Sequence, residues 1–306
     1  MKEGKGSPKR IRMGTVMLAF LMTTAIAAAG MPVFAEQDTV SLISYLGPEG
    51  TYTQEAAQRF FGEEERFLPK TTVAETIRML LDGECEYAVI PQENTIGGPV
   101  YDYLDEFLAH DGLTIVGEVE LPIRQALLAA KGTELKDIEV VYSHAQGIAQ
   151  GKQWLSEYLP EAEVVEVSST AEGARIVAEG SGRIAAAVAS QGAASVYGLS
   201  VLAESIQLND DNVTRFYVLS TQEPMTEKAD RIVFSAVGAA EGLPELMAAI
   251  EEAGMELKAI HDRPEKTTLG SYVYLIECEN GGLKEYESVS RTGGFEFCYY
   301  GAFPMG

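Results

Sequence analysis

The chain has 306 residues, with 46 Asp or Glu and 23 Lys or Arg, and its formal net charge at pH 7 is −23. An acidic chain without a basic patch is not suited to binding nucleic acid, so we expect no nucleic-acid partner. Its three cysteines stand in no CxxC or metal-like spacing, and its three histidines are far apart in the sequence. We therefore expect no metal site.

The first 35 residues have the form of a secretory signal peptide. The basic segment KEGKGSPKRIR is followed by an apolar run from Met13 to Gly30 and by VFA, which ends at Ala35. This order predicts export and cleavage before Glu36, with a periplasmic mature protein. An uncleaved membrane anchor is the alternative, although the apolar run is near the short end for a spanning helix.

Strand and helix patterns alternate from residue 36 to residue 222. Apolar runs predict strands, and segments with an apolar face at helical spacing, several of them ended by glycine, predict helices. The predicted strands lie within 39–47, 87–91, 113–130, 140–144, 163–167, 184–190 and 213–220, and the predicted helices at 53–62, 72–83, 100–110, 145–159 and 169–180. Such alternation predicts a mostly parallel sheet in two α/β lobes, with a ligand cleft between the lobes.

A polar, proline-containing segment at 221–230 then reads as a linker. The segments beyond it follow the order β-α-β-β-α-β, which is typical of a ferredoxin-like fold. We therefore expect a separate small domain at 230–306.

Polar clusters fall repeatedly where predicted strands pass into helices or where a strand begins. They are GPEGTYTQEA at 47–56, PQENTIGGPV at 91–100, SHAQGIAQ at 143–150, SSTAEGA at 168–174 and NVTRF at 212–216. Open α/β sheets bind ligands at these junctions, so the five clusters predict one shared site.

The order GPxGTYT, PxENTxxGxV, SHxQxxAQ, STAExA and NxTRF, followed by a β-α-β-β-α-β segment, resembles prephenate dehydratase with a C-terminal ACT domain. The resemblance runs from about Ser41 to the end of the chain. It implies a two-lobed dehydratase region like a type II periplasmic-binding protein at 36–222 and a ferredoxin-like ACT domain at 230–306. The implied reaction converts prephenate to phenylpyruvate with loss of carbon dioxide and water, and it needs no cofactor.

The resemblance and the chemistry of the substrate together suggest roles for the site residues. The Thr214 hydroxyl would donate a hydrogen bond to the oxygen that leaves as water. Arg215 would either bind a substrate carboxylate or brace its strand, and Phe216 would pack beside the ring or in the core. Glu93 would repel the substrate carboxylates and is expected to orient another side chain, such as Arg215. The other expected substrate-binding residues are Thr51, Thr53, Asn94, Thr95, Gly97, Ser169, Thr170 and Asn212, whereas His144 is expected to be structural or to lie behind the binding residues.

The C-terminal segment departs from the resemblance. ACT domains that bind phenylalanine have a Gly-Ala-Leu and a Glu-Ser-Arg-Pro stretch, where this chain reads EGL and HDRP. The candidate effector residues are Leu243, His261, Asp262, Arg263 and Pro264. The altered stretches and the export signal together predict relaxed regulation by phenylalanine.

Several alternatives stay open. ACT domains commonly pair, so a homodimer or higher homo-oligomer is expected, and Cys278 and Cys298 could be bridged or free. The same fold would also suit an arogenate or cyclohexadienyl dehydratase, and an exported solute-binding protein without catalysis is an alternative of another class.

Overall fold

The computed structural model describes residues 40–222 and 229–304. The predicted signal peptide and its cleavage site lie outside these residues. Among the described residues, none of the helices is long and apolar enough to cross a membrane.

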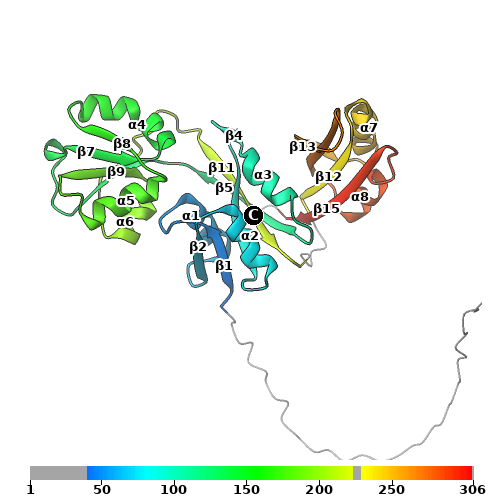
Figure 1. The fold of residues 1–306 in the computed structure, drawn as a ribbon, viewed down its shortest axis with the longest axis horizontal. Helices are drawn as coiled ribbons and strands as arrows, with labels where there is room; N and C mark the ends of the chain where they lie inside the picture. The colour runs from blue at the N-terminus through cyan, green and yellow to red at the C-terminus, as the bar shows by residue number, and fades with distance from the viewer. Residues whose placement is uncertain (1–39, 223–228, 305–306) are drawn as a thin grey trace, which may run out of the picture. The chain divides into compact units, whose positions relative to one another are not determined.

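The first sheet has the strand order β2-β1-β3-β11-β5, with β4 paired to β3 (Figure 1). Its strands are β1 (Leu42–Leu46), β2 (Arg66–Lys70), β3 (Tyr87–Asn94), β4 (Gly98–Pro99), β5 (Thr114–Pro122) and β11 (Val213–Ser220). β1 runs parallel to β2 and β3, but β11 runs antiparallel to β3 and β5. The prediction of a mostly parallel sheet is therefore wrong, because β11 returns to this sheet after the second sheet is complete and inserts between two earlier strands.

The helices of the first sheet are α1 (Tyr52–Phe61), α2 (Val73–Leu81) and α3 (Tyr101–Leu108). Alternate residues of β11 enter different cores, because successive side chains of a strand point to opposite faces. Phe216 and Val218 pack with residues of α1, whereas Tyr217 and Leu219 pack with residues of α2 and α3. The first sheet is thus buried on both faces.

The second sheet has the strand order β10-β6-β9-β7-β8 and is also mixed. Its strands are β6 (Ala126–Ala129), β7 (Val140–Ser143), β8 (Glu163–Glu166), β9 (Ala185–Ala189) and β10 (Ser200–Ala203), and its helices are η1 (Leu135–Asp137), α4 (Ala145–Tyr158), α5 (Thr170–Glu179) and α6 (Gln191–Tyr197). Ser169 caps α5 and Ser190 caps α6 by accepting a backbone N–H, as N-cap serines do.

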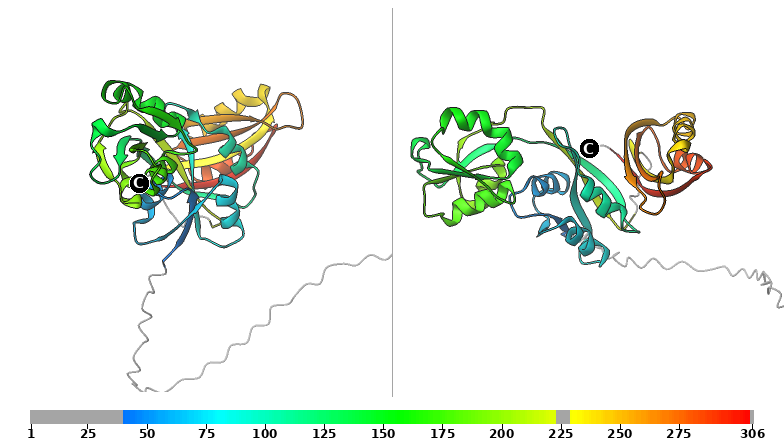
Figure 2. Two further views of the ribbon diagram at one scale, coloured as in Figure 1. Left: turned by 60° about the vertical axis from the view of Figure 1, so that its left-hand side comes forward. Right: turned by 45° about the horizontal axis from the view of Figure 1, so that its top comes forward.

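The third sheet is antiparallel, with the strand order β13-β14-β12-β15. Its elements are β12 (Arg231–Ala239), η2 (Ala240–Gly242), α7 (Leu243–Glu252), β13 (Glu256–Pro264), β14 (Ser271–Glu279), α8 (Leu283–Val289) and β15 (Phe295–Phe303). This arrangement confirms the predicted ferredoxin-like order. One face of the sheet carries α7 and α8 (Figure 2), and its other face contributes Val233, Leu275 and Tyr300 to the core under α2 and α3.

Buried charges lie where the third sheet meets the first. Glu277 of β14 is fully buried, and its Oε2 accepts hydrogen bonds from Arg215 at 2.7 Å and from Arg231 at 3.2 Å. Glu118 of β5 is buried beside them, with its Oε2 3.5 Å from Arg231 Nη1 and 3.8 Å from Arg215 Nη1. Neither oxygen of Glu118 has a hydrogen-bond partner among the described residues.

Burial raises the pKa of Glu118 to about 7, and the charges of Arg215 and Arg231 offset this rise only in part. The folded chain therefore holds this proton more tightly than the unfolded chain does. The resulting stability is fully present below the ordinary pKa near 4.5 and is lost as the pH rises to about 7.

We predict that Glu118→Gln removes this part of the pH dependence. Between pH 5 and pH 8 the wild-type free energy of unfolding should fall by about 2–3 kcal/mol more than that of the variant, by the linkage between pKa and stability. Urea unfolding at the two pH values measures the difference. Glu157→Gln, an exposed residue of α4, is the control and should behave as wild type. Equal pH dependence in wild type and Glu118→Gln would contradict the prediction.

Candidate active site

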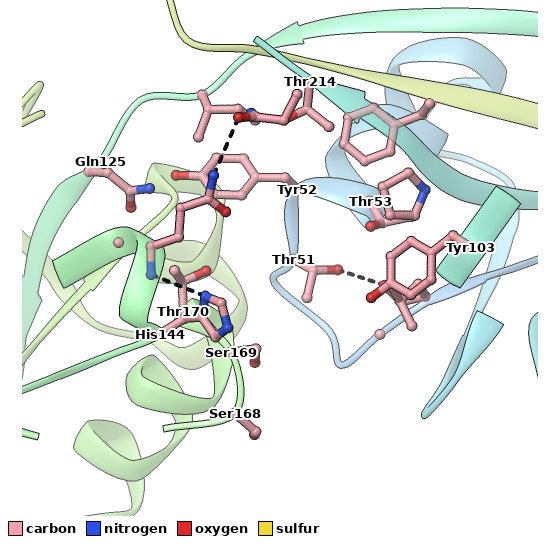
Figure 3. Close-up of a pocket in the computed structure, with 18 of the residues that line it drawn as sticks. Thr51, Tyr52, Thr53, Tyr103, Gln125, His144, Ser168, Ser169, Thr170 and Thr214 are labelled. Atoms are coloured by element: carbon pink, nitrogen blue, oxygen red, sulfur yellow. Dashed lines mark hydrogen bonds between the residues drawn. The ribbon is translucent and has the colours of Figure 1, made fainter. Parts of the chain in front are cut away.

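A cavity of about 340 Å³ is lined by residues from both the first-sheet and the second-sheet regions (Figure 3). This volume lies within the range of small-molecule sites. Among the described residues that line the cavity there is no Asp, Glu, Lys or Arg. Its polar groups are instead hydroxyls, amides, one imidazole and backbone groups, and apolar side chains such as Ile123 and Phe216 complete the wall.

Three helices begin at this cavity. Thr51 is the N-cap of α1, His144 of α4 and Ser169 of α5, and all three caps line the cavity. The first turn of a helix has backbone N–H groups without a helical partner, and the helix dipole adds partial positive charge there. These helix starts therefore give the cavity wall partial positive charge, which Glu55 and Glu172 in the first turns of α1 and α5 reduce in part.

Gly147 allows α4 to begin this close to α5. A Cβ on Gly147 would lie 2.5 Å from Ser143 Oγ and 3.0 Å from Thr170 Cγ2, which is too close for a side chain. The glycine thus permits the N-terminal turn of α4 to lie against Ser143, at the end of β7, and Thr170, at the start of α5.

Asn94 and Thr214 form the polar centre of the first-sheet wall. Asn94 Nδ2 donates to Thr214 Oγ1 at 2.8 Å and to Asn212 Oδ1 at 2.7 Å. Asn94 Oδ1 accepts from the Gly97 backbone N–H at 3.1 Å and from Gln146 Nε2 at 3.3 Å. Because Thr214 Oγ1 already accepts from Asn94, its own O–H is left as a donor that can point at a ligand.

A β-bulge sets which residues of β3 face the cavity. Arg215 lies opposite Glu93, and Phe216 lies opposite Pro91, so Gln92 is an extra residue without a partner on β11. The extra residue shifts the alternation of β3. Pro91 and Asn94 therefore line the cavity, and the side chains of Gln92 and Glu93 both reach Arg215.

The structure places Arg215 outside the cavity. Its side chain is almost fully buried, with Nε donating to Gln92 Oε1 at 3.1 Å and Nη2 donating to Glu93 Oε2 at 2.5 Å. The expected contact between Arg215 and a substrate carboxylate does not fit this geometry, because the guanidinium already has carboxylate partners on the other face of the sheet. Its alternative role, bracing the strand, agrees with these contacts, as does the expectation that Glu93 orients Arg215.

The other predicted site residues divide into two groups. Those that line the cavity are Thr51, Thr53, Asn94, Ser169, Thr170, Thr214 and Phe216. Thr95, Gly97 and Asn212 do not line it but surround Asn94. Thr95 Oγ1 accepts from the Val213 backbone N–H at 3.0 Å, which ties the end of β3 to the start of β11.

Several lining residues were missed or misplaced. His144 was expected behind the binding residues but lines the cavity, and its Nδ1 accepts the Gln146 backbone N–H at 3.3 Å. Gln146 and Gln150 also line it, and their spacing of four on a predicted helix could have identified them as one face. Tyr103 of α3 had no such signal, because only the apolar face of that helix was visible in the pattern.

The candidate effector residues do not share one environment. His261 is buried, with its Nε2 3.1 Å from Gln92 Nε2, and Arg263 pairs with Asp105 of α3 at 2.5 Å and 3.0 Å. Asp262 and Pro264 are exposed, and Leu243 packs beside the core of the third sheet.

Cys278 is buried, Cys298 is exposed and both are free, so the alternative of a bridge between them is not realised.

The comparisons with known proteins agree with this geometry. A family model described as prephenate dehydratase matches residues 43–224. The chain is 38% identical over 239 residues to the bifunctional chorismate mutase/prephenate dehydratase of Stutzerimonas stutzeri, covering 77% of this chain and 64% of that protein. It is 32% identical over 245 residues to the prephenate dehydratase of Lactococcus lactis subsp. cremoris, covering 78% and 86%.

The chain spans less than two thirds of the length of that bifunctional relative. Among solved structures, the prephenate dehydratase from Arthrobacter aurescens in complex with L-Phe is 30% identical with a TM-score of 0.76, covering 86% of this chain and 90% of that one. The prephenate dehydratase from Staphylococcus aureus is 27% identical with a TM-score of 0.73, covering 86% and 99%. The chain belongs to the prephenate dehydratase family.

Proposed function

We propose that the chain converts prephenate to phenylpyruvate with loss of carbon dioxide and water. The observation that carries this proposal is the Asn94–Thr214 hydrogen bond of 2.8 Å in a cavity without charged lining residues among those described. It holds one hydroxyl in place and leaves its proton available to a ligand. Family membership supports the same reaction.

Thr214 would act where the substrate's ring hydroxyl leaves. The bond from the ring to its carboxylate breaks, the electron pair enters the ring, and the bond to the opposite ring oxygen breaks. That oxygen gains negative charge as it departs and must take up one proton to become water. A hydrogen bond from Thr214 stabilises this charge, and the net proton comes from solvent because a threonine hydroxyl is itself a weak acid.

The two substrate carboxylates would bind at the helix N-termini. The starts of α1, α4 and α5 supply backbone N–H groups, and Thr53 and Thr170 add hydroxyls beside them. Helix N-termini bind carboxylates and phosphates by this means, each interaction contributing roughly 0.3–1 kcal/mol or more when partly buried. This arrangement takes the role that the sequence pattern had suggested for Arg215.

The cavity also bears on the choice between prephenate and arogenate. Arogenate carries an ammonium group where prephenate has a keto oxygen. Among the described residues that line the cavity there is no carboxylate to pair with an ammonium group. We therefore propose prephenate as the preferred substrate.

The C-terminal β-α-β-β-α-β unit is proposed to be an ACT domain through which the chain forms a homodimer. The antiparallel order β13-β14-β12-β15 supports this, and the relative from Arthrobacter aurescens was solved in complex with L-Phe. We propose only weak control by phenylalanine here, because His261 and Arg263 already contact first-sheet residues.

Thr214→Val should lower kcat for prephenate by about 100-fold or more, as removal of a donor to developing charge does, while KM changes by less than about threefold. Thr214→Ser keeps the hydroxyl and is the matched control, with kcat within about tenfold of wild type. Phenylpyruvate formation by purified protein measures both. A wild-type chain that binds prephenate without turnover would contradict the proposal and favour the solute-binding alternative.

Assayed in parallel, wild-type protein should have a kcat/KM for prephenate at least about tenfold higher than for arogenate, because an unpaired ammonium group in the cavity costs binding energy. Equal values, or a preference for arogenate, would contradict the proposed substrate.

Export is proposed from the basic and apolar N-terminal segments. When the full chain is expressed in a Gram-negative host, the mature protein should be recovered from the periplasmic fraction with Glu36 as its first residue. N-terminal sequencing measures this, and an intact Met1 in the soluble cytoplasmic fraction would contradict it.

A further inference from the structure

Thr214 and Arg215 are consecutive residues of β11 that serve opposite faces of the first sheet. Thr214 lines the cavity, whereas the Arg215 guanidinium is buried on the other face, toward the third sheet. Neighbouring side chains of a strand share one backbone segment. Contacts that hold one side chain in place therefore also restrict the orientation of the other.

Arg215 also holds β3, through the bulge at Gln92. Its Nε donates to Gln92 Oε1 at 3.1 Å, and its Nη2 donates to Glu93 Oε2 at 2.5 Å. The next residue of β3 is Asn94, which donates to Thr214 on the cavity face at 2.8 Å. On one face of the sheet, Arg215 thus holds β3 to β11 through Gln92 and Glu93, and we call these contacts the clamp. The other face of the same stretch carries the Asn94–Thr214 hydrogen bond.

Glu277 of the third sheet completes the clamp. Its Oε2 accepts from Arg215 Nη1 at 2.7 Å, and its Oε1 accepts from Tyr217 Oη at 2.6 Å and from Gln92 Nε2 at 3.2 Å. Glu277 is thus in direct contact with both strands that carry Thr214 and Asn94. It is fully buried and lies nearer to Arg215 Nη1 than Glu118 does, since Glu118 Oε2 is 3.8 Å from the same nitrogen.

We propose that Glu277 is a positioning residue for catalysis, which acts from the C-terminal unit through Arg215 and the bulge at Gln92 on the Asn94–Thr214 pair. Glu277 itself does not line the cavity. The inference rests on the proposed dehydratase function and adds that the third sheet is part of the machinery that aligns the active site. Loss of its carboxylate should let β3 and β11 shift while the cavity walls at α1, α4 and α5 stay in place.

The test compares Glu277→Gln with Glu279→Gln in the full chain. Glu279 lies two residues further along β14 and accepts from Arg231 at 3.3 Å, as Glu277 does at 3.2 Å, but no contact joins it to Arg215 among the described hydrogen bonds and ion pairs. We expect Glu277→Gln to lower kcat for prephenate by about 10- to 100-fold with KM within about threefold of wild type, because small misplacement of a catalytic group costs this much in rate. Glu279→Gln should keep the wild-type kcat.

A second variant keeps the test valid if Glu277→Gln does not fold, as circular dichroism and gel filtration would reveal. Arg215→Lys keeps the positive charge but loses the fork that holds Gln92, Glu93 and Glu277 together, so we expect the same selective loss of kcat. If Glu277 acts through Arg215, the double variant should lose no more kcat than the worse single variant, within about threefold.

Three outcomes would overturn the inference while leaving the dehydratase function intact. They are a kcat of folded Glu277→Gln within about twofold of wild type, an equal loss in Glu279→Gln, and multiplicative losses in the double variant. Failure of the wild-type chain to turn over prephenate would instead reject the proposed function, so the two failures are distinguishable.

Discussion

The bulge at Gln92 divides the polar residues of β3 between two faces of one sheet, and the arrangement of the site depends on this division. Asn94 stays on the cavity face with Thr214, while Gln92 and Glu93 turn to the buried face with Arg215. Without the extra residue, strict alternation would put Glu93 on the same face as Pro91, in the cavity wall. A carboxylate there would oppose the binding of an anionic substrate.

The charged groups on the buried face stabilise the fold only when all of them are present. An isolated guanidinium in the protein interior is very unfavourable, so Arg215 requires the carboxylates that surround it. Removing one partner from such a buried pair typically costs about 3–5 kcal/mol, because the remaining charge is left unpaired. Glu277 comes from the third sheet, so the electrostatic balance of the dehydratase region is completed by the C-terminal unit.

The cavity face has to bind negative charge instead of burying positive charge. In the proposed reaction this strongly acidic chain must bind a substrate with two carboxylates, and the lining residues described here include no lysine or arginine to do so. Three helix N-termini supply the positive potential instead, at fixed positions and without long side chains that would have to be ordered on binding. In the proposed complex, fixed backbone groups would hold the carboxylates in place of a lysine or arginine among the described lining residues, and the Thr214 hydroxyl would act on the leaving oxygen.

Much of this was accessible from the sequence. The α/β order and the ferredoxin-like C-terminal order follow from periodicity, and the strand-to-helix clusters correctly brought Thr51, Asn94, Ser169 and Thr214 together. The predictions failed where tertiary structure overrides local pattern. β2 was missed because RFLPK carries two charges and a proline.

The face of Arg215 and Glu93 could not be predicted either. It depends on the bulge and on Glu277, which lies 62 residues beyond Arg215 in the chain. A period of two, read along β3, contains no sign of the extra residue. The antiparallel direction of β11 could not be predicted either, because it depends on pairing with β3 and β5, which are distant in the sequence.

In the proposed complex, the helix N-termini and not Arg215 bind the substrate carboxylates. The most direct test is a crystal structure of Thr214→Val with prephenate bound. We expect both carboxylates at the starts of α1, α4 and α5, the ring hydroxyl facing residue 214, and Arg215 still paired with Glu277. A carboxylate bound to Arg215, with the contacts of Arg215 to Glu93 and Glu277 broken, would contradict this mode of binding.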